Sequence, residues 1–212
     1  MRMLNLGCGP VQPAGWVNVD GSVRAWFASR WSVFDRTLTG VGILPKSEFN
    51  RTTSYANLSK TLPWDANSVD AVYMGEMLEH FTQADGIKLL AECHRVLKPD
   101  GILRIRVPDN MRFWRNYLQE FDAAYAKPRA EWTEKHTRWV EMFFRDICVQ
   151  RKFRGSFGHY HKFMYDEISL IGTLERAGFR NVERRKYLES SIPNVKAVET
   201  HEDLTVEGIK PA

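Results

Sequence analysis

Two glycines and an aspartate near the start of the chain have the spacing of a ligand-binding turn. Gly7 and Gly9 follow the apolar run Met3–Leu6, and Asp20 ends a second short run at 17–20. Glycines allow a tight turn and let a ligand approach the backbone closely. An acid at the carboxyl end of the next strand suits ribose hydroxyls at the edge of an open α/β sheet. The spacing therefore indicates a ligand site, although a Gly-x-Gly turn alone more often only reverses the chain.

The elements that would position this turn alternate between strands and helices. Thr82 and Asp166 are typical helix-capping residues, and Lys98–Gly101 has the proline and glycine that end a helix. We expect helices at 22–34, 82–97 and 166–177, and strands at 3–6, 17–20, 53–57, 68–74, 102–107, 181–188 and 204–209. This alternation predicts an α/β fold with a Rossmann-like, seven-stranded, mostly parallel sheet and helices on both faces. The last two strands are expected to pair antiparallel at one sheet edge.

The composition is that of an ordinary globular domain. The chain has 212 residues, of which 43% are hydrophobic and 26% charged, so one domain with a sizeable core is expected. No apolar run is long enough to cross a bilayer and no leader sequence is visible, so we expect no membrane insertion. The three cysteines are odd in number and widely spaced, which favours a reducing, cytoplasmic compartment. The net charge of +4 is too small to indicate nucleic-acid binding.

Four landmarks follow one another in the first half of the chain. They are Leu4–Gly9 (LNLGCG), Leu62–Trp64 (LPW), Met77–Phe81 (MLEHF) and Arg95–Gly101 (RVLKPDG). Together they resemble the class I S-adenosylmethionine-dependent methyltransferases, and within these the bacterial branch linked to lipopolysaccharide and other surface-glycan synthesis. The resemblance covers residues 3–109 well and 159–210 more loosely. It implies a methyltransferase that uses S-adenosylmethionine and releases S-adenosylhomocysteine.

The resemblance also implies which residues bind the cofactor. In the family the glycine turn holds the methionine part, and the acid after the second strand holds the ribose. A polar residue after the third strand reads the adenine, and the loop after the fourth strand closes over the cofactor. The positions that correspond here are Asn5, Gly7, Cys8, Gly9, Asp20, Asn57, Leu58, Met74 and Gly75.

The chain departs from the common family pattern at three places. Asn5 stands where many members carry an acid, and Asn57 stands where an aspartate is frequent. An amide can still form hydrogen bonds, so both positions stay compatible with binding. The link 10–17 is shorter than the dozen or more residues of a usual parallel crossover, so its helix must be missing or reduced to one turn.

Methyl transfer to a hydroxyl needs a group that takes the proton. The candidates are Asp109, His80, His159 and His161. Asp109 ends the fifth strand and could instead cap the next segment. His80 could be bonded to the backbone at a helix start, and the two remaining histidines, which flank a tyrosine in a glycine-bounded loop, could be surface residues. The choice among the four stays open.

No metal site is expected. Asp109, Asn110 and Glu76 offer oxygen ligands of the kind that magnesium prefers. The Val-Pro-Asp run at 107–109, however, is common in family members that use no metal. No serine–histidine or cysteine–histidine pattern of nucleophilic catalysis is evident.

The segment 110–165 is predicted to be a helical insertion in a single methyltransferase domain that spans 1–212. It holds 14 of the 26 aromatic residues and 11 Lys or Arg against 6 Asp or Glu. Helices are expected over 112–125 and 132–144. The aromatic side chains could simply pack these helices on the sheet. The alternative is a substrate cover, because aromatic faces suit sugar rings and arginine binds phosphate or carboxylate.

The expected acceptor is a hydroxyl of a glycan or nucleotide-sugar precursor, which could be anionic. Other small molecules or nucleic acid are alternative substrates, and a non-catalytic scaffold of the same fold is a further alternative. Against nucleic acid, the Asn/Asp-Pro-Pro-Tyr type of run is absent after the fourth strand, where Met74-Gly75-Glu76 stands. The sequence does not indicate the oligomeric state.

Overall fold

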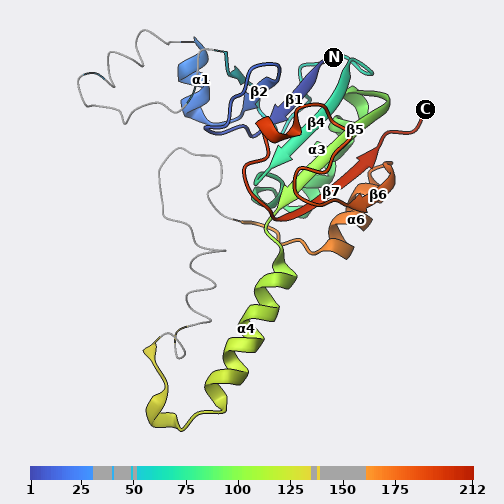
Figure 1. Ribbon diagram of the computed structural model, residues 1–212. Helices are drawn as coiled ribbons and strands as arrows, with labels where there is room; N and C mark the ends of the chain where they lie inside the picture. Colours follow the sequence, from blue (N-terminus) through green and yellow to red (C-terminus); the bar gives the residue numbers. More distant parts are fainter. Residues whose placement is uncertain (31–39, 41–48, 50–51, 135–137, 139–160) are drawn as a thin grey trace.

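The computed structural model describes residues 1–30, 40, 49, 52–134, 138 and 161–212. These residues form one seven-stranded sheet with the strand order β3-β2-β1-β4-β5-β7-β6. The strands are β1 (Met3–Leu6), β2 (Val17–Asp20), β3 (Ser54–Tyr55), β4 (Val69–Gly75), β5 (Leu97–Val107), β6 (Arg180–Arg184) and β7 (Leu204–Ile209). The predicted Rossmann-like, mostly parallel sheet is confirmed, and so is the predicted antiparallel pairing of its last two strands (Figure 1).

The strand order creates a switch point at β1. This strand pairs in parallel with β2 on one side and with β4 on the other. The segments that leave β1 and β4 at their carboxyl ends therefore turn away toward opposite halves of the sheet. Ligands of open α/β sheets bind in the crevice at such a point.

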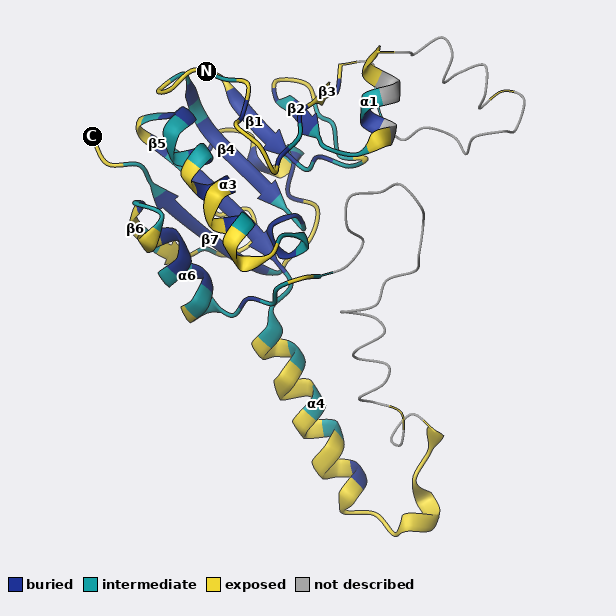
Figure 2. Cartoon of the chain, turned by 180° about the vertical axis from the view of Figure 1, so that it is seen from behind, coloured by how far each residue is buried: buried dark blue, intermediate teal, exposed yellow. Residues whose placement is uncertain are grey.

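Two helices cover one face of the sheet. They are α3 (Gln83–Val96) and α6 (Glu167–Arg176), and both bury leucines against the sheet in one hydrophobic core (Figure 2). Thr82 caps α3 by accepting a hydrogen bond from the amide of Asp85, as predicted. Asp166 caps α6 and forms a reciprocal capping box with Ser169, which confirms the second predicted helix start.

The segment between β6 and β7 covers part of the opposite face. This segment contains the short 3₁₀ helix η4 (Val195–Ala197), which packs with Trp16 and Tyr73. The fully buried Arg104 of β5 connects this segment to the sheet through ion pairs. The Arg104 guanidinium lies 2.7 Å from the carboxylate of Glu199 and 2.8 Å from that of Glu207.

The connection between β1 and β2 contains no helix, as its length predicts. Hydrogen bonds from two asparagine side chains stabilise this connection, where a longer crossover would have the backbone hydrogen bonds of a helix. Asn5 Nδ2 donates to the carbonyl of Val11, and Asn18 Nδ2 donates to the carbonyls of Pro13 and Trp16. The link therefore lies close to the ends of both strands. The next helix, α1 (Val23–Arg30), follows directly after β2 and contacts β3.

Several predicted boundaries need correction. β5 begins at Leu97 rather than Ile102, because Leu97 pairs with Val69 and Ile102 pairs with Ala71, with a register shift between the two pairs. β6 ends at Arg184 rather than Leu188. After Arg184 the chain leaves the sheet, and the carbonyls of Lys186 and Glu189 accept hydrogen bonds from the Arg104 guanidinium. β3 comprises only Ser54–Tyr55, and the predicted helix at 22–34 extends beyond the described residues.

The helix α4 (Asn110–Tyr125) extends away from the sheet (Figures 1 and 2). Phe121 and Tyr125 are half exposed or more, so the prediction that the aromatic residues of the insertion pack on the sheet does not hold for these two. The 3₁₀ helix η2 (Arg129–Glu131) follows, and most of the second predicted helix, 132–144, lies outside the described residues. No helix in the described part of the chain combines the length and apolar character needed to span a bilayer.

Candidate active site

The glycine turn lies at the carboxyl end of β1. The amides of Gly7 and Cys8 both donate to the carbonyl of Val19 in β2, at 2.8 and 3.0 Å. Gly7 and Gly9 have φ angles of 69° and 48°, in the region that favours glycine. A Cβ at Gly9 would have no atom within 4 Å, whereas one at Gly7 would meet Met77 Cγ at 2.4 Å. The turn is therefore packed on the Gly7 side and open on the Gly9 side.

Asp20 joins this turn to the start of α1. Its Oδ2 accepts a hydrogen bond from the amide of Gly9 at 3.2 Å, and its Oδ1 accepts one from the amide of Ser22 at 2.8 Å. Each carboxylate oxygen still has a lone pair available for a further donor. The carboxylate is also partly exposed to solvent. Asp20 is thus placed to accept hydrogen bonds from a diol that approaches the turn.

The other predicted cofactor residues lie at or near the same edge but in different environments. Asn57 is partly exposed and follows β3, and its Oδ1 accepts a hydrogen bond from the amide of Ser59. Leu58 is buried beside it. Gly75 ends β4, where a Cβ would lie 2.6 Å from the hydroxyl of Tyr73. Met74 is fully buried in the core beneath α3, so its side chain packs there instead of at the edge.

The side chains of Asn5 and Cys8 are buried in the protein interior next to the turn. Asn5 is buried, and its amide group bonds to Val11 and to Asn18 Oδ1. Cys8 is also buried, and burial raises the pKa of its thiol to about 12. A thiol with such a pKa stays protonated at neutral pH and is a poor nucleophile. Both side chains therefore have a structural role in the turn.

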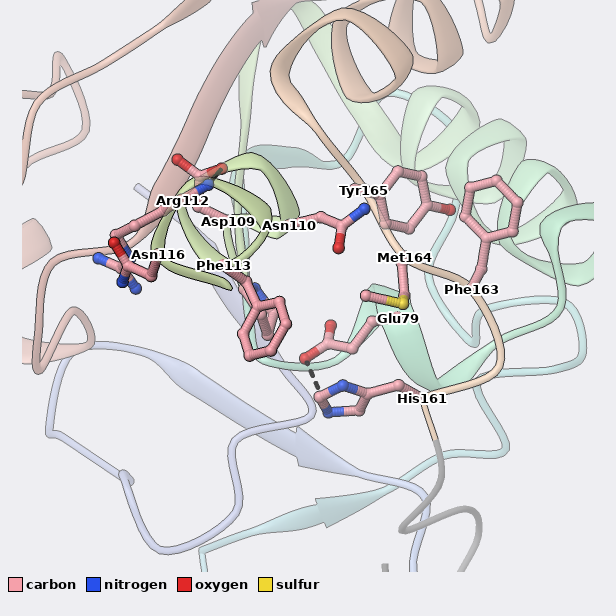
Figure 3. A pocket seen from close by; sticks show the side chains of 11 residues that line it. Glu79, Asp109, Asn110, Arg112, Phe113, Asn116, His161, Phe163, Met164 and Tyr165 are labelled. Atoms are coloured by element: carbon pink, nitrogen blue, oxygen red, sulfur yellow. Dashed lines mark hydrogen bonds and ion pairs between the residues drawn. The ribbon is translucent and has the colours of Figure 1, made fainter. Parts of the chain in front are cut away.

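A pocket of about 290 Å³ lies beyond the ends of β4 and β5 (Figure 3). Three segments form it: the 3₁₀ helix η1 (Leu78–His80) after β4, the first turns of α4 after β5, and the stretch 161–165 that leads to α6. The lining residues are Glu79, Pro108, Asp109, Asn110, Arg112, Phe113, Asn116, His161, Phe163, Met164 and Tyr165. The pocket thus combines polar and aromatic side chains from distant parts of the sequence.

Glu79 is the most unusual residue of this pocket. Its side chain is 2% exposed, and neither carboxylate oxygen has a hydrogen-bond partner among the described residues. Burial raises the pKa of this carboxyl to about 8. A carboxyl with this pKa is mostly protonated at pH 7, because its ionised form would carry a large desolvation cost. A buried acid with a shifted pKa at a pocket indicates a functional site.

Two histidines lie next to Glu79. His161 Nε2 is 3.9 Å from Glu79 Oε1, and the rings of His161 and His80 meet edge-on with their centres 5.0 Å apart. Burial, with a smaller contribution from His80, lowers the pKa of His161, so its imidazole is neutral at pH 7. The structure thus brings together two of the predicted histidines. His80 was expected at a helix start, but it ends η1, before the cap of α3.

Asp109 lines the same pocket and also caps α4. Its Oδ1 accepts a hydrogen bond from the amide of Arg112, and its Oδ2 lies 3.6 Å from Arg184 Nη2. Both roles that the sequence left open are therefore compatible with its position. The fourth candidate, His159, lies outside the described residues.

Comparisons with known proteins bear on the family and the fold of the chain. Residues 4–105 match the family model of a methyltransferase domain. This stretch contains the glycine turn, Asp20, η1, strands β2 to β4 and most of β1 and β5. The match covers 102 of the 212 residues, and this stretch is similar to methyltransferase domains. The enzyme therefore transfers a methyl group from S-adenosylmethionine, its cofactor.

Solved structures share the fold of this methyltransferase at low sequence identity. One is an S-adenosylmethionine-dependent methyltransferase from Archaeoglobus fulgidus, with 15% identity and a TM-score of 0.53, matched over 99% of this chain and 86% of that one. A possible histamine N-methyltransferase from Thermotoga maritima has 14% identity and a TM-score of 0.50 over 99% and 82%. PigF with SAH has 12% identity and a TM-score of 0.50 over 100% and 56%. A search of curated proteins gave no significant match.

The residues at the β1–β2 edge of the methyltransferase fit S-adenosylmethionine. The open side of Gly9 leaves room for a ligand against the backbone, and Asp20 offers acceptors for two ribose hydroxyls. The Nδ2 donor of Asn57 is unused in the described part of the chain and could bind a ring nitrogen of adenine.

Sequence reasoning missed Glu79 as a site residue. Glu79 belongs to the Met77–Phe81 landmark, where it could be recognised only as part of the resemblance. The available signal was an acid next to a histidine directly after a buried strand, at the functional edge of the sheet. Its burial and its contact with His161 depend on tertiary structure and have no counterpart in the local sequence.

Proposed function

We propose that the enzyme methylates a hydroxyl of a glycan or nucleotide-sugar precursor bound in the Glu79 pocket. One observation carries this proposal. Both carboxylate oxygens of Glu79 and Oδ1 of Asn110 are buried at the pocket without a hydrogen-bond partner among the described residues. Unpaired buried acceptors are costly, and a ligand with several hydroxyl groups would supply the missing donors.

The cofactor in this proposal occupies the edge formed by β1, β2 and β3. The turn at Gly7–Gly9 receives the methionine part, and the carboxylate of Asp20 accepts hydrogen bonds from the ribose hydroxyls. Asn57 and Leu58 contact the adenine. The packing of Gly7 on Met77 connects this edge to the segment that continues into η1 and Glu79.

The pocket also has the features expected for a sugar linked to phosphate. Phe113 and Phe163 offer aromatic surface beside the polar groups, which suits the apolar face of a sugar ring. Arg112 is mostly exposed at the pocket and lies 2.9 Å from Asp203, so its guanidinium is held in place with donors to spare. A phosphate or carboxylate of the acceptor would bind there.

When bound, S-adenosylmethionine supplies an electrophilic methyl group. The protein then has to align the acceptor hydroxyl with that group and remove its proton. His161 and Asp109 both line the pocket, and each can accept the proton. Glu79, which lines the same pocket, is 2% exposed and so is shielded from bulk solvent.

The insertion 110–165 contributes to the acceptor site of a single domain that spans the chain. The start of α4 supplies Asn110, Arg112, Phe113 and Asn116, and the end of the insertion supplies His161, Phe163 and Tyr165. Both ends of the insertion thus line one pocket, which supports its role as a substrate cover.

The test is methyl transfer from S-adenosylmethionine with a labelled methyl group to a panel of nucleotide sugars. Histamine and a mixed RNA serve as competing acceptors. We expect one or more nucleotide sugars to acquire an O-methyl group, identified by mass and by the NMR shift of the methyl. Asn110→Ala should lower kcat/KM about tenfold, because it removes one pocket acceptor. The matched control Gln119→Ala, on the exposed part of α4, should be unaffected.

Labelling of histamine or RNA without labelling of any sugar would contradict the proposed acceptor. Cofactor binding without transfer to any acceptor would favour the scaffold alternative. Equal activity of Asn110→Ala and the native enzyme on a nucleotide sugar would contradict the assignment of this pocket.

A further inference from the structure

Glu79, His80 and His161 form a compact group of potential metal ligands beside the pocket. One ligand atom of each residue lies within 4.8 Å of the others. The pair Glu79 Oε1–His161 Nε2 is separated by 3.9 Å. Ligands of a single transition-metal ion are usually about 3–4 Å apart, because each bond is close to 2.1 Å. Small side-chain adjustments would therefore bring the three groups onto one ion.

Backbone hydrogen bonds hold the two segments that supply these ligands. The carbonyl of Glu79 accepts hydrogen bonds from the amides of Lys162 and Phe163, at 2.8 and 3.2 Å. The amide of His80 donates to the carbonyl of Met77 at 3.1 Å. His161 is thus fixed next to Glu79 although it comes from a different part of the sequence. Such preorganisation is what a metal site requires of its ligands.

The state of Glu79 points independently to a cation. Its side chain is 2% exposed, and both carboxyl oxygens lack a hydrogen-bond partner among the described residues. Buried carboxylates are normally paired or bound to a metal, because an unpaired one is strongly destabilising. Figure 3 shows the carboxylate directed toward His161 within the pocket.

We propose that Glu79, His80 and His161 bind a divalent transition-metal ion at the pocket. Two imidazoles and one carboxylate favour Mn²⁺, Fe²⁺, Co²⁺ or Zn²⁺ over Mg²⁺ and Ca²⁺, which prefer oxygen ligands. Three protein ligands leave at least one coordination position open, as in catalytic metal sites. That position would face the pocket and could take a water or an oxygen of the acceptor.

This inference deepens the proposed function but does not depend on it, because ion binding can be measured without an acceptor. With an ion bound, His161 is a ligand, and Asp109 is the remaining pocket group that can accept the proton of the hydroxyl. An acceptor hydroxyl bound to the ion at its open position would have a lowered pKa, which would assist its deprotonation.

A neighbouring group provides a matched control. Glu76, His201 and Asp203 also lie within 4.8 Å of one another. Asp203 Oδ1, however, already accepts hydrogen bonds from the amides of Asp109 and Leu204 and from Arg112 Nη2. His201 is about half exposed, and Glu76 lies 3.5 Å from Arg106 Nε. This second group therefore has less need of a cation than Glu79 has.

The experiment titrates the chelator-treated full-length protein with Co²⁺ and with Zn²⁺. Calorimetry gives the affinity and stoichiometry, and the visible absorption of Co²⁺ reports on its ligands. We expect one ion per chain, with binding weakened about 100-fold or more in Glu79→Gln and His161→Asn. The control His201→Asn should bind like the native protein.

Two further measurements make the outcome decisive. Circular dichroism and the melting temperature show whether each variant is folded. Titration with S-adenosylhomocysteine, whose proposed site lies at the ends of β1 and β2, separates loss of the metal site from loss of the cofactor site. No ion binding by the folded native protein would overturn the inference. Binding that survives Glu79→Gln, or that His201→Asn abolishes instead, would also overturn it.

Discussion

Glu79 Oε1 and His161 Nε2 lie 3.9 Å apart, one directly after β4 and the other ahead of α6. This contact joins the matched methyltransferase region, which ends at residue 105, to a segment outside it. The family match accounts for the glycine turn and Asp20. It does not account for the pocket, which needs both ends of the insertion.

Replacing Glu79 should separate activity from stability. In Glu79→Gln a neutral amide of the same size replaces the buried carboxyl. We therefore expect an unchanged melting temperature at acid pH, where the native carboxyl is protonated in the folded and the unfolded chain. As the pH rises toward about 8 the variant should melt higher than the native protein, because the unfolded native chain ionises this carboxyl more readily than the folded one. Methyl transfer should fall about 100-fold, because the pocket loses the carboxylate next to His161. Thermal denaturation and steady-state kinetics measure the two effects. A variant that is unstable but retains full activity would show that Glu79 has a purely structural role.

The ion pairs of Arg104 should be important for stability. Arg104→Met would leave the buried carboxylate of Glu199 without its cation and would leave Glu207 with only the more distant Arg185, at a cost of about 3–5 kcal/mol. Urea denaturation measures this change in the free energy of unfolding. The triple variant with Glu199→Leu and Glu207→Leu should recover much of the loss, since no unpaired charge remains. No recovery would mean that the carbonyls of Lys186 and Glu189 require the guanidinium more than the carboxylates do.

The two glycines of the turn should respond differently to alanine. In Gly7→Ala the new Cβ would lie 2.4 Å from Met77 Cγ at a φ of 69°, so we expect a loss of about 1–3 kcal/mol in stability. In Gly9→Ala the Cβ has open space, so the stability loss should be about 1 kcal/mol. Its methyl group, however, would occupy the side on which the cofactor approaches. Affinity for S-adenosylhomocysteine should therefore fall more than stability does, and the reverse order for Gly9→Ala would contradict this placement.

Acid should loosen the loop that carries Leu62 and Trp64. The hydrogen bond from Arg95 lowers the pKa of Glu92, which also accepts a hydrogen bond from the amide of Leu62. A carboxyl whose pKa is lowered by folding stabilises the protein above its unfolded-state pKa, and this stabilisation is lost as the pH falls through the folded-state value. Glu92→Gln should therefore reduce the melting temperature at pH 7 but show a shallower decline below about pH 4. Parallel acid limbs for both proteins would refute the assignment.

The sequence predicts the sheet well because its signals are local. Thr82 and Asp166 carry their capping function in their own side chains, and the runs at 3–6 and 69–75 are buried strands of ordinary composition. Boundaries fail where tertiary contacts decide them. β6 ends early because Arg104, far away in sequence, binds the carbonyls of Lys186 and Glu189.

The candidate site likewise has residues that local sequence identifies and residues that depend on tertiary contacts. Gly7, Gly9 and Asp20 can be identified from a short stretch, since a turn and an acid at a strand end are local features. His161 is also a candidate from the sequence, but its pairing with Glu79 is not, because their proximity depends on hydrogen bonds from Lys162 and Phe163 to the carbonyl of Glu79. No spacing rule in the sequence relates the two segments.

Calorimetric titration with S-adenosylhomocysteine tests the placement of the cofactor most directly. The native protein should bind with micromolar affinity, about −8 kcal/mol. Asp20→Asn keeps the acceptor for the Ser22 amide but loses the charge that faces the ribose, so binding should weaken about tenfold to a hundredfold. Asp65→Asn, an exposed acid elsewhere, serves as the control. Unchanged affinity in folded Asp20→Asn would contradict the cofactor site at the β1–β2 edge.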